Sequence, residues 1–193
     1  MATLTDPHQV RLTGENQYMR LHVEAQGPMT TRGSHWRILL SPAGAGHVLF
    51  LRSDVTDNQV RIYADSPPLA RWLQQEILTT GEFADQTQAI MAARFSRMGD
   101  TQSFWTETVE TAEEHLMLTW RDFGEPFVIT VPVGSDPNRP LGWSSVFVPA
   151  RSAQLTLNGR VATGRPFPEQ RGERLSSTAG LALSETWLRP SSS

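Results

Sequence analysis

The sequence predicts a mainly antiparallel all-β protein with one substantial helix, folded as a lipocalin-like barrel or as a closed β-sandwich. Apolar and polar residues alternate with a period of two in many short segments, which is typical of strands with one buried face. Fourteen glycines and thirteen prolines are spread over the 193 residues, as expected for many short elements joined by turns. The length fits a single β-barrel-like domain over residues 1–189, followed by a disordered tail over residues 190–193.

The first part of the chain predicts four strands in succession. Loops rich in glycine, proline and aspartate separate the alternating segments, which are residues 19–25, 36–40, 48–50 and 60–64. Consecutive strands joined by short loops predict an antiparallel meander.

One helix follows the meander. Asp65 and Ser66 are candidate N-cap residues, and Pro67 fits the first helical turn. Apolar side chains then recur at helical spacing before Gly81, at Leu69, Trp72, Leu73 and Ile77. We expect this helix to begin near Pro67 and to pack its Trp72 face on the sheet. Residues 85–94 fit a helix or a strand, and the pattern does not decide between them.

The rest of the chain returns to strands, predicted at residues 104–110, 115–121, 127–133, 143–148, 154–157, 160–162 and 181–188. Asn158 and Gly159 predict a tight hairpin turn, because both central residues of a type I′ turn need positive φ. With about ten strands, the sheet edges need protection, either by closure into a barrel or by packing of two sheets.

The segment from Phe104 to Trp120 predicts a hairpin with an unusual inner face. If Ala112 and Glu113 form the centre of its turn, the residues of one face are Trp105, Glu107, Val109, Leu116, Leu118 and Trp120. This register matches apolar faces better than an odd-length loop would. It places the Glu107 carboxylate among apolar side chains.

The last predicted strand repeats this arrangement. Leu181, Leu183, Glu185 and Trp187 share one parity, so Glu185 also lies among apolar neighbours beside a tryptophan. Burial in apolar surroundings raises the pKa of a carboxyl group, which suits it to proton transfer near neutral pH. We therefore predict Glu107 and Glu185 as catalytic residues that face one shared cavity.

Further side chains are predicted to contact the ligand in that cavity, namely Trp105, Trp120, Trp187, Arg37 and Arg52. A structural interpretation stays open for both glutamates. Each could pair with an arginine of a neighbouring strand, where Arg37, Arg52 and Arg94 are available, or could reach water at the rim. Residues 159–174 are predicted to form a long irregular loop that is either a solvated connection or an arginine-bearing lid for an anionic ligand group.

The leading functional hypothesis is a cofactor-independent enzyme of small-molecule metabolism that uses acid/base catalysis, such as an isomerase, cyclase or lyase. The alternative is a non-catalytic, lipocalin-like carrier of an apolar metabolite. A third hypothesis is a sugar-binding β-sandwich, whose tryptophans would form exposed platforms.

Composition excludes several other classes. A net charge of −3 and a pI near 5.9, without a basic stripe, argue against nucleic acid as a partner. The chain contains no cysteine, and its five histidines lack metal-ligand spacing, so we predict no metal and no other cofactor. The sequence has neither a signal-peptide pattern nor an apolar stretch of membrane-spanning length, so we expect a cytoplasmic protein without membrane contact.

Overall fold

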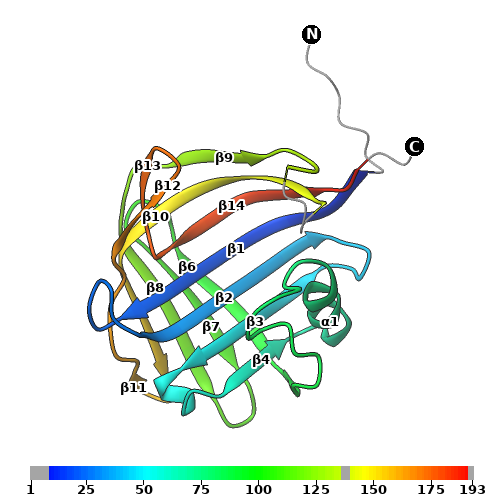
Figure 1. Cartoon of the computed structure of the whole chain (residues 1–193). Helices are drawn as coiled ribbons and strands as arrows, with labels where there is room; N and C mark the ends of the chain where they lie inside the picture. Colours follow the sequence, from blue (N-terminus) through cyan, green and yellow to red (C-terminus); the bar gives the residue numbers. More distant parts are fainter. Residues whose placement is uncertain (1–8, 136–139, 191–193) are drawn as a thin grey trace.

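The computed structural model describes residues 9–135 and 140–190, and strands account for 59 % of the structure. Most of them form one sheet, in the order β5-β4-β3-β2-β1-β14-β10-β8-β7-β6, with β9 and β11 paired to β10 (Figure 1). The first strands are β1 (Val10–His22), β2 (Met29–Leu40), β3 (Gly46–Ser53), β4 (Val60–Ala64), β5 (Ile90–Ala92), β6 (Arg94–Gly99) and β7 (Phe104–Glu110). They are followed by β8 (His115–Phe123), β9 (Phe127–Val131), β10 (Gly142–Leu157), β11 (Arg160–Val161), β12 (Pro168–Arg171), β13 (Arg174–Ser177) and β14 (Ala179–Leu188).

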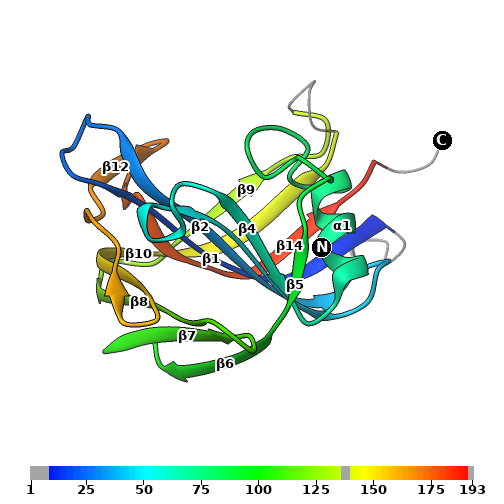
Figure 2. The ribbon, with the colours of Figure 1, turned by 90° about the horizontal axis from the view of Figure 1, so that it is seen from below.

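The ten-stranded path is a nearly closed barrel, which confirms the predicted all-β fold and the barrel alternative. Strands β1 to β4 pair antiparallel with their neighbours and form the predicted meander. Strands β5 and β6 are the two ends of the path, yet only Ala93 separates them in the chain. The chain itself therefore links both edges of the sheet, as Figure 2 shows from below. The ambiguous segment of residues 85–94 is not helical: residues 85–89 form turns and irregular structure, and the rest contains β5 and the start of β6.

The predicted helix is α1 (Pro67–Glu76), which follows Ser66 as its N-cap. It buries Leu69, Ala70 and Leu73 against the outer face of the sheet, while Trp72 lies partly buried at the edge of this contact. A 3₁₀ turn at Asp54–Thr56 connects β3 to β4. Within the described residues, no helix combines the length and the apolar character that crossing a membrane requires.

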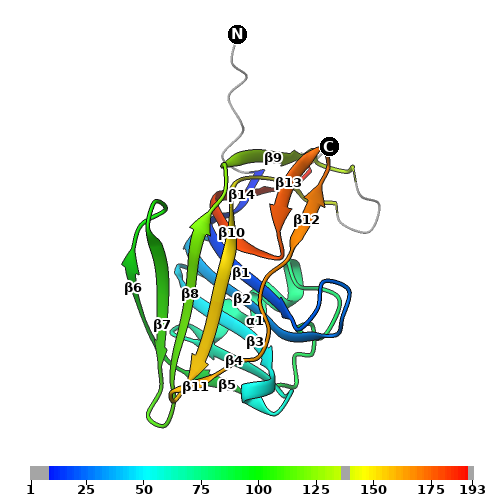
Figure 3. The ribbon, with the colours of Figure 1, turned by 90° about the vertical axis from the view of Figure 1, so that its left-hand side faces the viewer.

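Apolar side chains cover both faces of the sheet. The apolar interior of the barrel is filled from β1, β3 and β4 on one side and β7, β8, β10 and β14 on the other, with Leu51 and Trp120 fully buried. The outer face carries a second apolar cluster, in which Trp36 and Phe50 pack beneath α1. In Figure 3, α1 and the β12–β13 hairpin lie on one side of β1–β4, and β6–β8 lie on the other.

The tight turn predicted at Asn158 and Gly159 is confirmed, because their φ angles are +49° and +80° between the paired residues Leu157 and Arg160. The Asn158 side chain also accepts a hydrogen bond from the His115 backbone N–H over 2.7 Å. This contact links the turn to the end of the β7–β8 hairpin.

Strand β11 confirms the strand predicted at residues 160–162. The rest of the segment to residue 174 differs from the prediction of a long irregular loop, because it contains β12, which pairs with β13 in a separate two-stranded sheet. Alternation is too short in these four-residue strands to be recognised from sequence. Of the predicted tail, residues 191–193 lie outside the described residues.

Candidate functional site

The β7–β8 hairpin has the predicted register. Trp105 pairs with Trp120, Glu107 with Leu118, and Glu110 with His115. The Glu107 side chain faces the barrel interior and is only 2 % exposed. The alternation of the sequence was therefore sufficient to place this carboxylate.

Two donors hold Glu107. The Arg97 Nε–H donates to Glu107 Oε1 over 2.6 Å, and the Trp105 indole N–H donates to the same oxygen over 2.8 Å. Arg97 also donates to Glu15 over 2.6 Å, and its guanidinium carbon lies 4.2 Å from the centre of the Trp105 ring. The arginine partner expected in the structural interpretation is thus present, but it is Arg97 rather than Arg37, Arg52 or Arg94.

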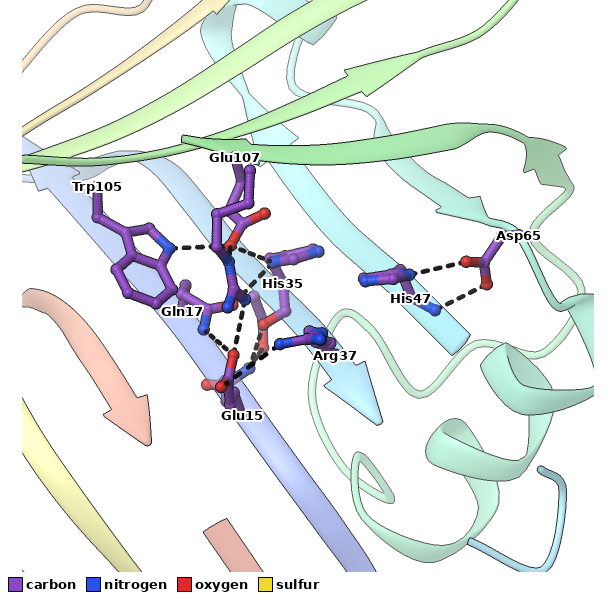
Figure 4. Close-up of polar contacts among 11 residues, drawn as sticks. Glu15, Gln17, His35, Arg37, His47, Asp65, Trp105 and Glu107 are labelled. Atoms are coloured by element: carbon purple, nitrogen blue, oxygen red, sulfur yellow. Dashed lines mark hydrogen bonds and ion pairs between the residues drawn. The ribbon is translucent and has the colours of Figure 1, made fainter. Parts of the chain in front are cut away.

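A buried histidine lies beside Glu107 (Figure 4). The His35 Nδ1 is 2.8 Å from Gln17 Oε1 and 3.9 Å from Glu107 Oε1, whereas its buried Nε2 has no hydrogen-bond partner among the described residues. Burial lowers the pKa of His35 well below its ordinary value, and His47 and the nearby arginines lower it further. Burial also raises the pKa of Glu107, although Arg97 acts in the opposite direction.

These residues form a polar layer at one end of the barrel, which we call the barrel-end cluster. Its members are Glu15, Gln17, His35, Arg37, His47, Asp65, Arg97, Trp105 and Glu107. Arg37 lies at the rim, 3.8 Å from Glu15, and His47 hydrogen-bonds to Asp65 over 2.8 Å. The cluster pairs most of its charges internally and joins β1, β2, β3, β6 and β7.

The other predicted interior tryptophan is a packing residue. Trp120 is fully buried, and its indole N–H donates to the Tyr18 carbonyl over 2.9 Å. Together, Trp105 and Trp120 fill the interior. The aromatic-lined cavity that the structure contains lies outside the barrel.

Glu185 does not face the interior, so the predicted cavity shared with Glu107 is wrong. Leu181 and Leu183 contact the interior core, as their parity predicts. The register of β14 then shifts against both β1 and β10, and Ser184 has a φ of +51°. A bulge adds one residue to a strand and reverses the parity beyond it. Glu185 and Trp187 therefore point to the outer face.

Glu185 lines a cavity of about 360 Å³ on that outer face. We call it the outer groove; its lining residues are Asn16, Tyr18, Arg20, Arg32, Gly33, Ser34, Trp36, Ile77, Leu78, Trp143, Phe147, Arg171, Ala182, Glu185 and Trp187. They come from β1, β2, β10, β12, β14 and the segment after α1. Glu185 is 5 % exposed and accepts a hydrogen bond from the Trp187 indole over 2.5 Å.

Aromatic rings form much of the groove wall. Trp143 stacks on Trp187 with a centroid distance of 5.9 Å, and Phe147 lies 6.0 Å from Trp143. Trp36 is 4 % exposed, and its indole nitrogen is buried without a hydrogen-bond partner in the described part of the chain. Leaving a buried N–H unpaired costs about 1–3 kcal/mol, so this donor marks a place for an acceptor.

Three arginines, Arg20, Arg32 and Arg171, line the groove. Arg20, Arg32 and Arg52 are direct neighbours across β1, β2 and β3, and we call these three the arginine row. Arg171 of β12 approaches them, with its guanidinium 5.0 Å from the Tyr18 ring centre. Arg171 thus belongs to residues 159–174, the segment that the sequence predicted to be either a solvated connection or an arginine-bearing lid.

The predicted site residues are divided between these locations. Trp105 and Glu107 belong to the barrel-end cluster, and Arg37 lies at its rim, whereas Glu185 and Trp187 line the outer groove. Arg52 belongs to the arginine row, and Trp120 belongs to the interior core.

Sequence reasoning missed His35 and Trp36. The alternation of residues 36–40 indicated correctly that Trp36 and Ile38 share a face of β2, but the opposite face is also buried and carries the polar Thr31 and His35. Where both faces of a strand are buried, period-two alternation does not show which face lines the barrel interior. Across the described ranges, no three His, Asp or Glu side chains are grouped as metal ligands.

Comparison of the chain with family models, with curated proteins and with solved structures finds no match in any of the three. The fold and its cavity define the protein as a mainly antiparallel, nearly closed β-barrel with an aromatic groove on its outer face.

Proposed function

We propose that the protein binds a small, largely apolar molecule in the outer groove. The observation that carries this proposal is the cavity of about 360 Å³ with stacked aromatic walls, one of whose lining residues, Trp36, has a buried indole N–H without a partner among the described residues. Stacked aromatic walls supply apolar contact area, and a single unpaired donor supplies orientation. Both the enzyme hypothesis and the carrier hypothesis share this binding step.

Catalysis is the second candidate, and the position of Glu185 favours it. A buried carboxylate in the aromatic groove lies where it can exchange a proton with a bound molecule. Such a site would perform cofactor-independent isomerase, cyclase or lyase chemistry with Glu185 as the proton-transfer group. Glu107 is held by Arg97 and Trp105, and these contacts favour a structural role for it.

The sugar-binding hypothesis has less support. It requires tryptophans exposed as platforms, whereas Trp105, Trp120 and Trp187 are all at least nine-tenths buried.

A groove-filling variant tests the proposal. Ser34 lines the groove, so Ser34→Phe places a ring inside it, whereas Ser103→Phe adds the same ring on an exposed loop. We would titrate each protein with N-phenyl-1-naphthylamine, an uncharged fluorescent probe, and count bound molecules by native mass spectrometry. We expect one probe molecule on the wild type and on Ser103→Phe, and a loss of binding in Ser34→Phe. Equal binding by all three proteins, or binding by none, would contradict the proposal.

A further inference from the structure

The arginine row is an unusual arrangement for a β-sheet. Arg20 pairs with Arg32 in the β1–β2 register, and Arg32 pairs with Arg52 in the β2–β3 register. Like charges directly opposite each other on adjacent strands destabilise a sheet. The row therefore needs anionic partners.

Within residues 9–135 and 140–190, two carboxylates pair with four guanidinium groups, those of the arginine row and of Arg171. Glu169 contacts Arg20 at 2.5 Å and Arg171 at 3.0 Å, so two arginines share one carboxylate. Glu82 contacts Arg32 at 3.3 Å and also contacts Arg52, which repeats the arrangement. Each glutamate together with its two arginines therefore has an excess of one positive charge.

The acid that lines the groove does not neutralise this excess. Glu185 lies opposite Gly14 on β1, six residues from Arg20, which at about 3.3 Å per residue is a separation of about 20 Å. Charges separated by more than about 10 Å in water are largely screened at ordinary ionic strength. The positive charge of the groove is thus concentrated at Arg20, Arg32 and Arg171, and the rings of Trp36 and Phe147 lie between these arginines and Glu185.

Arg171 is already fixed in position for a ligand. Its guanidinium lies 4.7 Å from the Phe147 ring centre and 5.0 Å from that of Tyr18, while its Nε–H donates to Glu169. A guanidinium that is stacked and hydrogen-bonded loses little side-chain freedom when it binds an anion.

We infer that the outer groove binds an amphipathic anion, with its apolar body against the aromatic wall and its acidic group between Arg20, Arg32 and Arg171. This inference rests on the proposed function, since it names the chemical class of ligand for the same groove. Carboxylate, sulfonate and phosphate groups each offer two or more oxygens to the planar guanidinium groups of neighbouring arginines.

A pair of matched probes tests the charge requirement. 1-Anilinonaphthalene-8-sulfonate and N-phenyl-1-naphthylamine share one aromatic body and differ by the sulfonate. We expect the sulfonate to bind about tenfold tighter, because a hydrogen bond to a charged group contributes about 1.5 kcal/mol or more. Fluorescence titration gives both dissociation constants, and added NaCl should weaken only the binding of the anionic probe.

Variants assign the effect to the arginines. Arg32→Gln and Arg171→Gln should each weaken sulfonate binding by a factor at least about fivefold larger than the factor by which they weaken binding of the neutral probe. Arg160→Gln, on the exposed β11, is the matched control and should change neither. Glu82→Gln and Glu169→Gln should tighten sulfonate binding, which keeps the inference testable if an arginine variant fails to fold.

The outcomes distinguish the binding of an anion from the proposed function on which it rests, the binding of an apolar molecule in the outer groove. If neither probe binds to the groove, the proposed function fails. If both probes bind equally, or if Arg160→Gln weakens sulfonate binding as much as Arg32→Gln and Arg171→Gln do, the groove binds apolar molecules without regard to charge and the inference is overturned. Tighter sulfonate binding that depends on Arg32 and Arg171 supports both.

Discussion

Glu107 and Glu185 lie on opposite faces of one sheet, although each carboxylate accepts a hydrogen bond from a tryptophan indole two residues away. Trp105 donates to Glu107 over 2.8 Å inside the barrel, and Trp187 donates to Glu185 over 2.5 Å in the outer groove. The bulge at Ser184 causes the difference. The two carboxylates therefore cannot act on the same bound molecule.

Substitutions at Ser184 test the bulge. Its φ of +51° lies in the left-handed region, which glycine adopts freely and β-branched residues disfavour. We expect Ser184→Val to lower the free energy of unfolding by more than about 1 kcal/mol and Ser184→Gly to change it by less than about 0.5 kcal/mol. Urea denaturation measures both values. Equal destabilisation by valine and glycine would argue against a left-handed residue here.

The Glu107–Arg97 pair is expected to stabilise the barrel end. Removing one member of a buried ion pair leaves the other charge poorly compensated, although Glu15 still contacts Arg97. We expect Glu107→Gln to cost about 2 kcal/mol and a double-mutant cycle with Arg97→Gln to give a coupling energy of about 1 kcal/mol or more.

A matched control for this cycle lies on the same two strands. Arg94 and Glu110 also pair across β6 and β7, but the Arg94 side chain is 86 % exposed. Their coupling should stay below about 0.5 kcal/mol. If the coupling of Glu107 with Arg97 were no larger than this, the structural role of Glu107 would be excluded.

Stability should depend on pH through His35. Its pKa in the folded protein is well below 6.5, so below pH 6.5 the unfolded chain binds a proton that the folded protein excludes. Unfolding is therefore favoured as the pH falls. Glu107 acts oppositely, because its raised pKa makes the folded protein bind a proton more readily above pH 4.5.

Substitution of His35 isolates its contribution to the pH dependence of the unfolding free energy. His35→Asn retains a donor toward Gln17 but does not titrate. Between pH 7.5 and pH 5.5, we expect the wild type to lose about 1 kcal/mol more unfolding free energy than His35→Asn. His115→Asn, at an exposed position, serves as the control and should follow the wild type. Parallel pH curves for His35→Asn and the wild type would show that His35 is not buried in its neutral form.

The Asn158–Gly159 turn gives a test of pure backbone strain. A Cβ atom added at Gly159 would meet no atom within 4 Å, so only its φ of +80° opposes a side chain. Gly159→Val should lower the free energy of unfolding by more than about 1 kcal/mol. An unchanged denaturation midpoint would be inconsistent with this turn.

Local patterns in the sequence were sufficient for much of the fold. The alternation of residues 104–120 predicted the β7–β8 register, Asn158 and Gly159 predicted a turn, and Ser66 with Pro67 predicted the start of α1. Each of these signals acts over a few residues, so tertiary context did not override it.

The site was predicted less completely, because it depends on long-range geometry. The alternation placed Glu107 on the correct face of the sheet. It placed Glu185 on the wrong face, because a bulge at Ser184 shifts the alternation by one residue, and the positive φ of this serine has no clear sequence signal. Prediction of the arginine row would have required the registers of β1, β2 and β3 together. Arg171 required the position of a hairpin whose strands are four residues long.

The tryptophan indole N–H signals in a ¹H–¹⁵N nuclear magnetic resonance spectrum test the central claim most directly. The chain has six tryptophans, which report separately on the groove at residues 36, 143 and 187, on the interior at residues 105 and 120, and on α1 at residue 72. On titration with 1-anilinonaphthalene-8-sulfonate, we expect the signals of Trp36, Trp143 and Trp187 to shift, with the largest change at the unpaired Trp36 indole. Shifts confined to Trp105 and Trp120, or none at all, would contradict ligand binding in the outer groove.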